Sequence, residues 1–228
     1  MHESMPGKKF YHTPPPLHRS SPLISFFASV SLIVALIKFP PSFLQQTTRS
    51  MSTKKTWKVF WDLQCPYSKK NWERFSAIQS KFATEYDFSI HLTSLLFHPQ
   101  AFTAQCAATL VKETKGPEAW RTYVDACFEQ QDSFMNAAVG DARKSEIDAI
   151  FAGIAETSGV LDADNFTKDF FLTNLHDWEL AIKPAWTEHK EALALGVVGT
   201  PESVIDGVLI DDSESDWGPE EWAKKLGK

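Results

Sequence analysis

The strongest constraint on the fold is the order in which the spacing of apolar residues changes along the chain. A short aromatic and β-branched run at residues 57–62 is typical of a buried strand. Apolar residues three and four positions apart predict a helix over residues 66–84, and alternating apolar and polar residues predict a second strand at 87–95. A strand, a helix and a strand in this length indicate a βαβ unit with parallel strands and a right-handed crossover.

The spacing stays helical through the middle of the chain, from about residue 100 to 195. Gly116-Pro117 and Gly159 divide this region, because glycine and proline interrupt helices. We expect helices there at residues 102–114, 117–131, 144–158, 165–171 and 175–195.

The spacing changes again after Gly196. Two short apolar runs, 202–205 and 208–210, flank Asp206-Gly207, and Asp-Gly between such runs is the strongest short hairpin signal. Residues 217–226 predict a closing helix. The complete order is β-α-β, a helical insertion, and β-β-α, which predicts an α/β fold.

Two short motifs resemble signatures of one family in which this order occurs. Cys65-Pro66-Tyr67-Ser68 follows the first strand and resembles the active-site turn of DsbA-like proteins in the thioredoxin superfamily, where Cys-Pro-Tyr-Cys is a common form. Val198-Gly199-Thr200-Pro201 resembles the second signature, a proline in a cis peptide bond beside the active cysteine. The resemblance covers residues 57–228. It implies a thioredoxin-like fold with a helical insertion between the β-α-β and β-β-α halves, Cys65 and Ser68 in the catalytic motif with Pro66 and Tyr67 in support, and Thr200 and Pro201 in substrate binding.

One departure from the family pattern matters for the chemistry. Ser68 stands where the second cysteine belongs, so the motif resembles a monothiol, Cys-x-x-Ser variant. Without that partner, a mixed disulfide on Cys65 must be released by another thiol. The alternative interpretations of Ser68 are an ordinary serine of a first helical turn, or a lineage that lost the dithiol activity.

The position of Cys65 suits a nucleophile. Thiols attack as thiolates, and unpaired N–H groups at a helix N-terminus favour an anion. Ser68 lies one turn further on, where its hydroxyl can donate to the sulfur. Lys69 and Lys70 add positive potential, whereas Asp62 opposes it if its carboxylate points at Cys65. The alternative is a buried structural thiol.

The remaining candidate residues each carry two interpretations. A cis bond before Pro201 would turn the backbone of Thr200 towards Cys65, where it can bond an extended substrate, whereas a trans proline would simply open a strand. Cys106 and Cys127 lie in helical patterns as small core residues, or one of them resolves a disulfide with Cys65.

These features predict a thiol-disulfide exchange oxidoreductase that acts through one cysteine, by deglutathionylation or by disulfide isomerisation. The expected partners are glutathione and disulfide-containing or glutathionylated proteins, with glutathione as a co-substrate and no bound cofactor. Two alternatives are a kappa-class glutathione transferase or isomerase, which carries serine where Cys65 stands, and a non-catalytic module that binds extended peptides.

Charge and residue spacing exclude several other classes. The formal net charge of −6, without a basic run, argues against nucleic-acid binding. Three cysteines are too few for a disulfide-stapled scaffold, and we expect no metal site because neither Cys-x-x-Cys nor His-Glu-x-x-His occurs.

The first fifty residues differ from the rest. Basic residues precede an apolar run at 23–37 of about signal-peptide length, and with Phe39 this run (residues 23–39) is a candidate membrane anchor. We therefore expect a targeting segment and linker at 1–50 and the DsbA-like domain at 51–228. The protein would enter the secretory pathway or be anchored in a membrane if residues 1–50 are translated, and would be cytoplasmic if translation begins at Met51.

Overall fold

A βαβ unit opens the part of the chain that the computed structural model describes, residues 54–228. Strand β1 (Lys55–Trp61) leads into helix α1 (Pro66–Phe82), and β2 (Tyr86–Leu92) returns parallel to β1. Pro66 occupies the first turn of α1, where its missing N–H would have had no helical partner. The predicted βαβ unit is confirmed.

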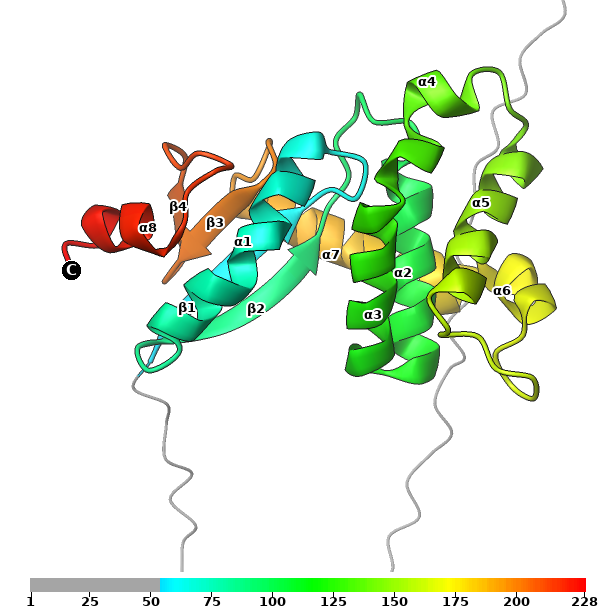
Figure 1. Cartoon of the computed structure of the whole chain (residues 1–228), viewed down its shortest axis with the longest axis horizontal. Coiled ribbons are helices and arrows are strands. Elements are labelled where there is room, and N and C mark those ends of the chain that lie inside the picture. Colours follow the sequence, from blue (N-terminus) through cyan, green and yellow to red (C-terminus); the bar gives the residue numbers. More distant parts are fainter. Residues whose placement is uncertain (1–53) are drawn as a thin grey trace, which may run out of the picture. The chain divides into compact units, whose positions relative to one another are not determined.

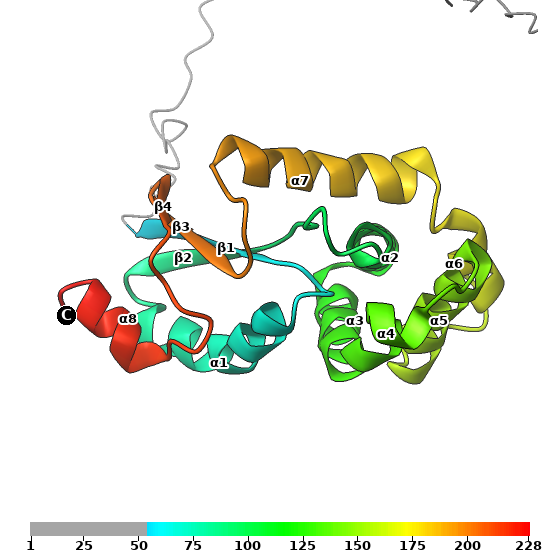
Figure 2. The ribbon, with the colours of Figure 1, turned by 90° about the horizontal axis from the view of Figure 1, so that it is seen from above.

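The helical insertion follows β2 and runs to the end of α7. Its elements are α2 (Ala101–Lys115), α3 (Pro117–Glu129), the 3-10 turn η2 (Gln131–Phe134), α4 (Asn136–Val139), α5 (Lys144–Thr157), α6 (Lys168–Asn174), the π-helical turn η3 (Trp178–Ile182) and α7 (Lys183–Ala194). Its helices α2 to α6 lie beside the sheet, on the right in Figure 1, and α7 runs back along one face of the sheet (Figure 2).

A hairpin and a helix complete the order predicted from the sequence. Strands β3 (Glu202–Ile205) and β4 (Val208–Ile210) pair antiparallel, and α8 (Pro219–Lys225) follows. Asp206 and Gly207 both have positive φ, at 49° and 79°, as a two-residue turn between antiparallel strands requires. The sheet has the order β2-β1-β3-β4, with β3 antiparallel to β1.

Helices cover both faces of this sheet. Figure 2 shows α7 along one face and α1 with α8 along the other. Alternation along β1 explains the arrangement, because successive strand residues point to opposite faces. Trp57 packs against Phe82 of α1 and Trp222 of α8, with ring centroids 5.7 and 4.6 Å away, whereas Phe60 lies in a separate buried cluster with Ala192 of α7.

Three predicted boundaries were wrong for local reasons. The strand expected to reach residue 95 ends at Leu92, because the Leu95 N–H donates to the Asp62 carboxylate instead of continuing the sheet. The helix expected at 165–171 begins at Lys168, because the Asp162 carboxylate accepts from the N–H groups of residues 164, 165 and 166 and holds them in a loop. The helix expected at 175–195 begins later, where Asp177 caps the π-helical turn.

The targeting segment expected at residues 1–50, with its anchor at 23–39, lies outside the described residues. Within residues 54–228 no helix is both long enough and apolar enough to span a membrane.

Candidate functional site

Cys65 lies at the N-cap of α1, directly after the turn that leaves β1. Its backbone N–H donates to the carbonyl of Asp62 at 3.0 Å, which closes the turn directly before α1. Pro66 and Tyr67, the next two residues, are exposed, whereas Cys65 itself is only 3% exposed. The cysteine is therefore held at the edge of the buried core and flanked by accessible residues.

The second predicted motif meets the first at this cysteine. The peptide bond between Thr200 and Pro201 is cis. The thiol of Cys65 donates to the carbonyl oxygen of Thr200, with sulfur and oxygen 3.3 Å apart. Two segments 135 residues apart in sequence thus form one site.

Ser68 is fully buried one turn along α1, and its contacts differ from the expectation. Its hydroxyl oxygen accepts a hydrogen bond from the backbone N–H of Asp62 at 3.1 Å. The hydrogen bond described for this hydroxyl therefore closes the turn in front of Cys65 and does not reach its sulfur. The Lys70 ammonium, expected to add positive potential near the sulfur, is paired with Asp216 at 3.1 Å.

Asp62 is fully buried, and its carboxylate has three donors. One oxygen accepts from the N–H of Gln64 at 2.7 Å, and the other accepts from the N–H of Leu95 at 2.9 Å and from Nδ1 of His98 at 2.7 Å. Burial raises the pKa of Asp62, and the three hydrogen bonds oppose that rise. The three donors thus belong to the turn before α1 and to the loop after β2.

A buried group of amide side chains, which sequence reasoning missed, ties the turn to the helical insertion. Nε2 of Gln131, in η2, donates to the carbonyls of Leu63 and Cys65 at 2.8 and 3.0 Å. The Gln64 side chain donates to the carbonyl of Phe134 and accepts from the N–H of Gln100. Glutamines in helical stretches have no distinctive spacing, so the sequence held no signal for this role.

The other two cysteines are buried in the insertion. Cys106 lies in α2 and Cys127 in α3, each at most 1% exposed, and all three cysteines are free thiols. Burial raises the pKa of Cys106 to about 12 and raises that of Cys127 further. Their interpretation as small core residues therefore fits the structure, and neither is paired with Cys65.

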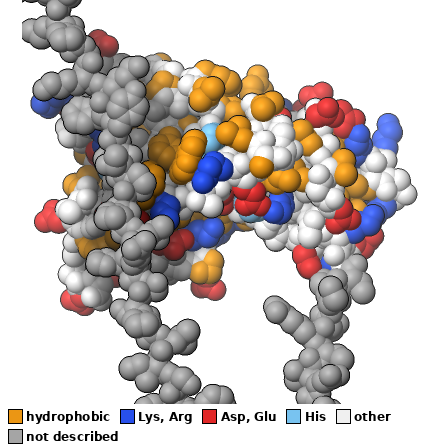
Figure 3. All heavy atoms as spheres, turned by 180° about the vertical axis from the view of Figure 1, so that it is seen from behind, with side chains coloured by type: hydrophobic (Ala, Val, Ile, Leu, Met, Phe, Trp, Pro, Cys, Tyr) orange, Lys and Arg blue, Asp and Glu red, His pale blue; other side chains and the backbone are white. Residues whose placement is uncertain are grey.

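An apolar groove lies between the loop after β2 and α7. Two adjoining cavities of about 210 and 280 Å³ share the wall formed by Leu95, Leu96 and His189. Val198, two residues before Thr200, lines the first cavity, and Trp186 lines the second. Figure 3, which views the α7 side, shows hydrophobic side chains gathered around a histidine.

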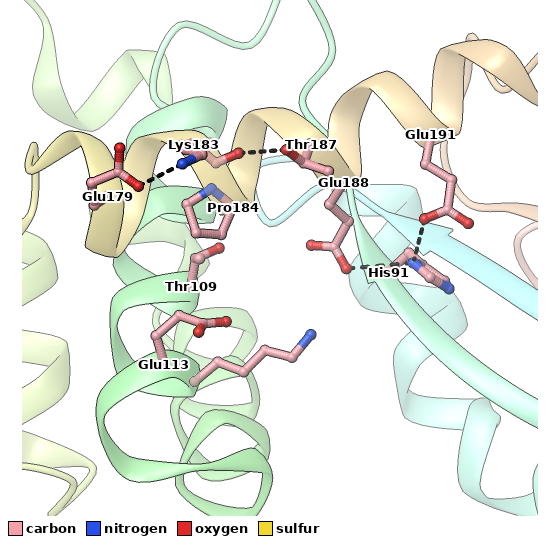
Figure 4. Close-up of a pocket in the computed structure, with 10 residues that line it drawn as sticks. His91, Thr109, Glu113, Glu179, Lys183, Pro184, Thr187, Glu188 and Glu191 are labelled. Atoms are coloured by element: carbon pink, nitrogen blue, oxygen red, sulfur yellow. Dashed lines mark hydrogen bonds and ion pairs between the residues drawn. The ribbon is translucent and has the colours of Figure 1, made fainter. Parts of the chain in front are cut away.

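A separate cavity of about 480 Å³ lies between α2, α7 and β2, and its lining is charged (Figure 4). His91 faces Glu188 there, with Nδ1 and Oε1 3.4 Å apart, and Lys183 pairs with Glu179. None of its lining residues belongs to the Cys65 turn or to the Thr200 loop. We therefore place the candidate site at the apolar groove.

Comparison with solved structures identifies the fold. A Pseudomonas syringae protein proposed to be a protein-disulfide isomerase shares 20% identity and a TM-score of 0.61, with 76% of this chain and 93% of that chain covered. MdbA, a thiol-disulfide oxidoreductase from Corynebacterium diphtheriae, shares 18% identity and a TM-score of 0.54 (78% and 85% covered). DsbA from Pseudomonas aeruginosa shares 20% identity and a TM-score of 0.52 (78% and 83% covered).

These likenesses show that the chain has the DsbA-like form of the thioredoxin fold, with its helical insertion. No protein-family model matches the chain, and no curated protein matches it in sequence.

Proposed function

We propose that the protein is a thiol-disulfide exchange enzyme in which Cys65 is the only nucleophilic cysteine. The observation that carries the proposal is the position of the thiol, at the N-terminus of α1 and 3.3 Å from the Thr200 carbonyl. Thiols attack disulfides as thiolates, and a helix N-terminus is a favourable position for an anion. The fold shared with thiol-disulfide oxidoreductases supports the same assignment.

The reaction needs an external thiol to complete a cycle. The Cys65 thiolate attacks one sulfur of the substrate disulfide, so that a new S–S bond forms, the old one breaks, and the departing thiolate takes up a proton. With a glutathionylated protein as substrate, Cys65 then carries the glutathione. A glutathione thiolate attacks that adduct, which releases glutathione disulfide and regenerates the Cys65 thiolate. In an isomerisation, a second thiol of the substrate performs this release.

Ser68 and the burial of Cys106 and Cys127 support this dependence on an outside thiol. The hydroxyl at position 68 does not form a disulfide, and the two buried thiols have raised pKa values that leave little thiolate near neutral pH.

The groove supports a polypeptide as the substrate. Its apolar lining includes Trp186, Leu193 and Val198, which are 43%, 50% and 76% exposed. Clustered apolar side chains of this kind mark interaction surfaces on soluble proteins. A substrate segment that bonds to the backbone of Thr200 would extend from Val198 into this groove.

The test uses the full chain and compares it with the Cys65→Ala and Ser68→Ala variants. We expect the wild type to remove glutathione from a glutathionylated peptide once per protein molecule without added thiol, and repeatedly only when free glutathione is present. Cys65→Ala should lose both activities completely. Ser68→Ala should retain both activities but unfold more readily, because the serine hydroxyl does not react and its loss leaves the buried Asp62 N–H without that acceptor.

Two outcomes would replace the proposal. Activity in Cys65→Ser towards a chromogenic electrophile, with glutathione as the other substrate, would indicate a glutathione transferase. Binding of the peptide without any exchange, at every thiol concentration, would indicate a peptide-binding module.

A further inference from the structure

One oxygen of the buried Asp62 carboxylate organises a tight turn in the loop after β2. The N–H of Leu95 and Nδ1 of His98 both donate to Oδ2, at 2.9 and 2.7 Å. The N–H of His98 also donates to the carbonyl of Leu95 at 3.0 Å, so Leu95 and His98 are the first and last residues of a four-residue turn. The carboxylate thus holds both ends of this turn.

The two middle residues of the turn are apolar and face solvent. Leu96 is 99% exposed and Phe97 is 69% exposed, although residues of this type are normally buried. Both line the apolar groove, with Val198 and Leu193 on the same cavity. Two exposed apolar side chains on a turn that is held at both ends form a preorganised contact surface, because little conformational freedom remains to be lost on binding.

The other carboxylate oxygen connects this turn to the nucleophile. Oδ1 of Asp62 accepts from the N–H of Gln64, the residue before Cys65, while the carbonyl of Asp62 accepts from the N–H of Cys65 itself. One buried side chain therefore accepts hydrogen bonds both from the turn before Cys65 and from the turn that carries Leu96 and Phe97.

We propose that Asp62 and His98 are positioning residues that hold Leu96 and Phe97 beside Cys65, so that the enzyme prefers disulfides with a large apolar residue next to the reacting cysteine. The inference rests on the proposed function for its substrate and concerns which polypeptides that site accepts. Of the two residues, His98 is the better one to replace, because its side chain is 15% exposed whereas that of Asp62 is fully buried.

The experiment compares two disulfide substrates in the full chain. One is a glutathionylated peptide with Leu and Phe beside its cysteine, and the other is the small disulfide of 2-mercaptoethanol, which has no apolar flank. In His98→Phe the ring remains but the donor to Asp62 is lost. We expect KM for the peptide to rise about tenfold, as for the loss of one charge-assisted hydrogen bond. The value of kcat and the rate with the small disulfide should change less than about twofold.

A conservative variant and a matched control separate positioning from stability. His98→Asn restores an N–H donor at the place of Nδ1 and should recover most of the wild-type KM. His176→Phe removes a similar pair, Nε2 of His176 with Asp148 at 2.9 Å, in the insertion, and should leave KM unchanged. The double variant Leu96→Ser with Phe97→Ser, at exposed positions where folding is not at stake, should reproduce the rise in KM.

Two results would overturn the inference. One is an unchanged KM for the peptide in both His98→Phe and the double serine variant, and the other is an equal loss with both disulfides. Binding of the peptide with serine in place of its cysteine, followed by fluorescence anisotropy, needs no exchange. If the wild type turns over neither disulfide, the proposed function fails, and this binding measurement still decides the role of His98.

Discussion

Replacing Gln131 by leucine should destabilise the protein more than any comparable change at the surface. Gln131 is 2% exposed and its Nε2 donates to two buried carbonyls, those of Leu63 and Cys65. Leucine has a similar size but no donor. The Cys65 carbonyl would keep one partner, the N–H of Lys69 at 3.2 Å, whereas the Leu63 carbonyl would lose the donor described for it.

The size of the effect follows from these contacts. A typical hydrogen bond contributes about 1 kcal/mol net, and a buried carbonyl left without a partner costs about 1–3 kcal/mol. Losing the bond to Cys65 and stranding the Leu63 carbonyl should together lower the free energy of unfolding by about 3 kcal/mol. With a urea m-value of about 2 kcal/mol/M, the unfolding midpoint should fall by about 1.5 M.

Urea unfolding followed by tryptophan fluorescence measures this change, and Gln130→Leu is its matched control. Gln130 carries the same side chain one residue earlier, but its bond to Thr157 Oγ1 is exposed, so the control should stay within about 0.5 kcal/mol of the wild type. Equal midpoints for the two variants would refute the view that the insertion supports the Cys65 turn through Gln131.

Three further predictions concern cysteine reactivity and pH. Iodoacetamide at pH 8 should modify the native full chain at Cys65 alone, because Cys65 adjoins the exposed Pro66 and Tyr67, whereas Cys106 and Cys127 lie inside the insertion with raised pKa values. All three cysteines should react after unfolding, and mass spectrometry that finds Cys106 or Cys127 labelled in the native protein would contradict this. Ser68→Cys should release one glutathione per protein molecule without added thiol, because the new thiol can attack the mixed disulfide and form a disulfide with Cys65, after which an external reductant must restore both thiols before a second cycle. No release of glutathione in that first cycle would count against the assigned role of position 68. Burial lowers the pKa of His189 in the folded protein. Near and below pH 6.5 the unfolded chain therefore binds a proton at this histidine more readily than the folded protein does, and the free energy of unfolding should fall as the pH drops from 7.5 to 5.5. His189→Asn should reduce this fall in the urea midpoint, and an identical pH dependence would show that His189 is not its source.

The parts of the fold that the sequence predicted are those with strong local signals. Residue spacing gave the order of elements, and Asp206-Gly207 gave the hairpin. Boundaries failed where a side chain captured backbone N–H groups, as Asp162 does in the loop before α6. The spacing of apolar residues does not predict these hydrogen bonds from side chain to backbone, because each depends on one carboxylate and on the direction in which it points.

The same division holds for the candidate site. Cys65 and Thr200 were predicted from motifs, and the structure brings them together. For Asp62 the sequence predicts only a negative charge near the sulfur. Its hydrogen bonds to Leu95 and His98 depend on how the loop after β2 packs, which the sequence pattern does not show. Gln131 gave no signal, because its partners lie 66 and 68 residues away and are backbone carbonyls that every residue type offers.

The separation between Cys65 and Thr200 has a consequence for synthesis. Ribosomes add about 5–20 residues per second, so the 135 residues between them take about 7–27 s to be made. During that interval the new chain carries Cys65 without the carbonyl that meets it in the folded protein. During synthesis the Cys65 thiol is thus exposed to the thiols and disulfides of the cell for a period before folding buries it.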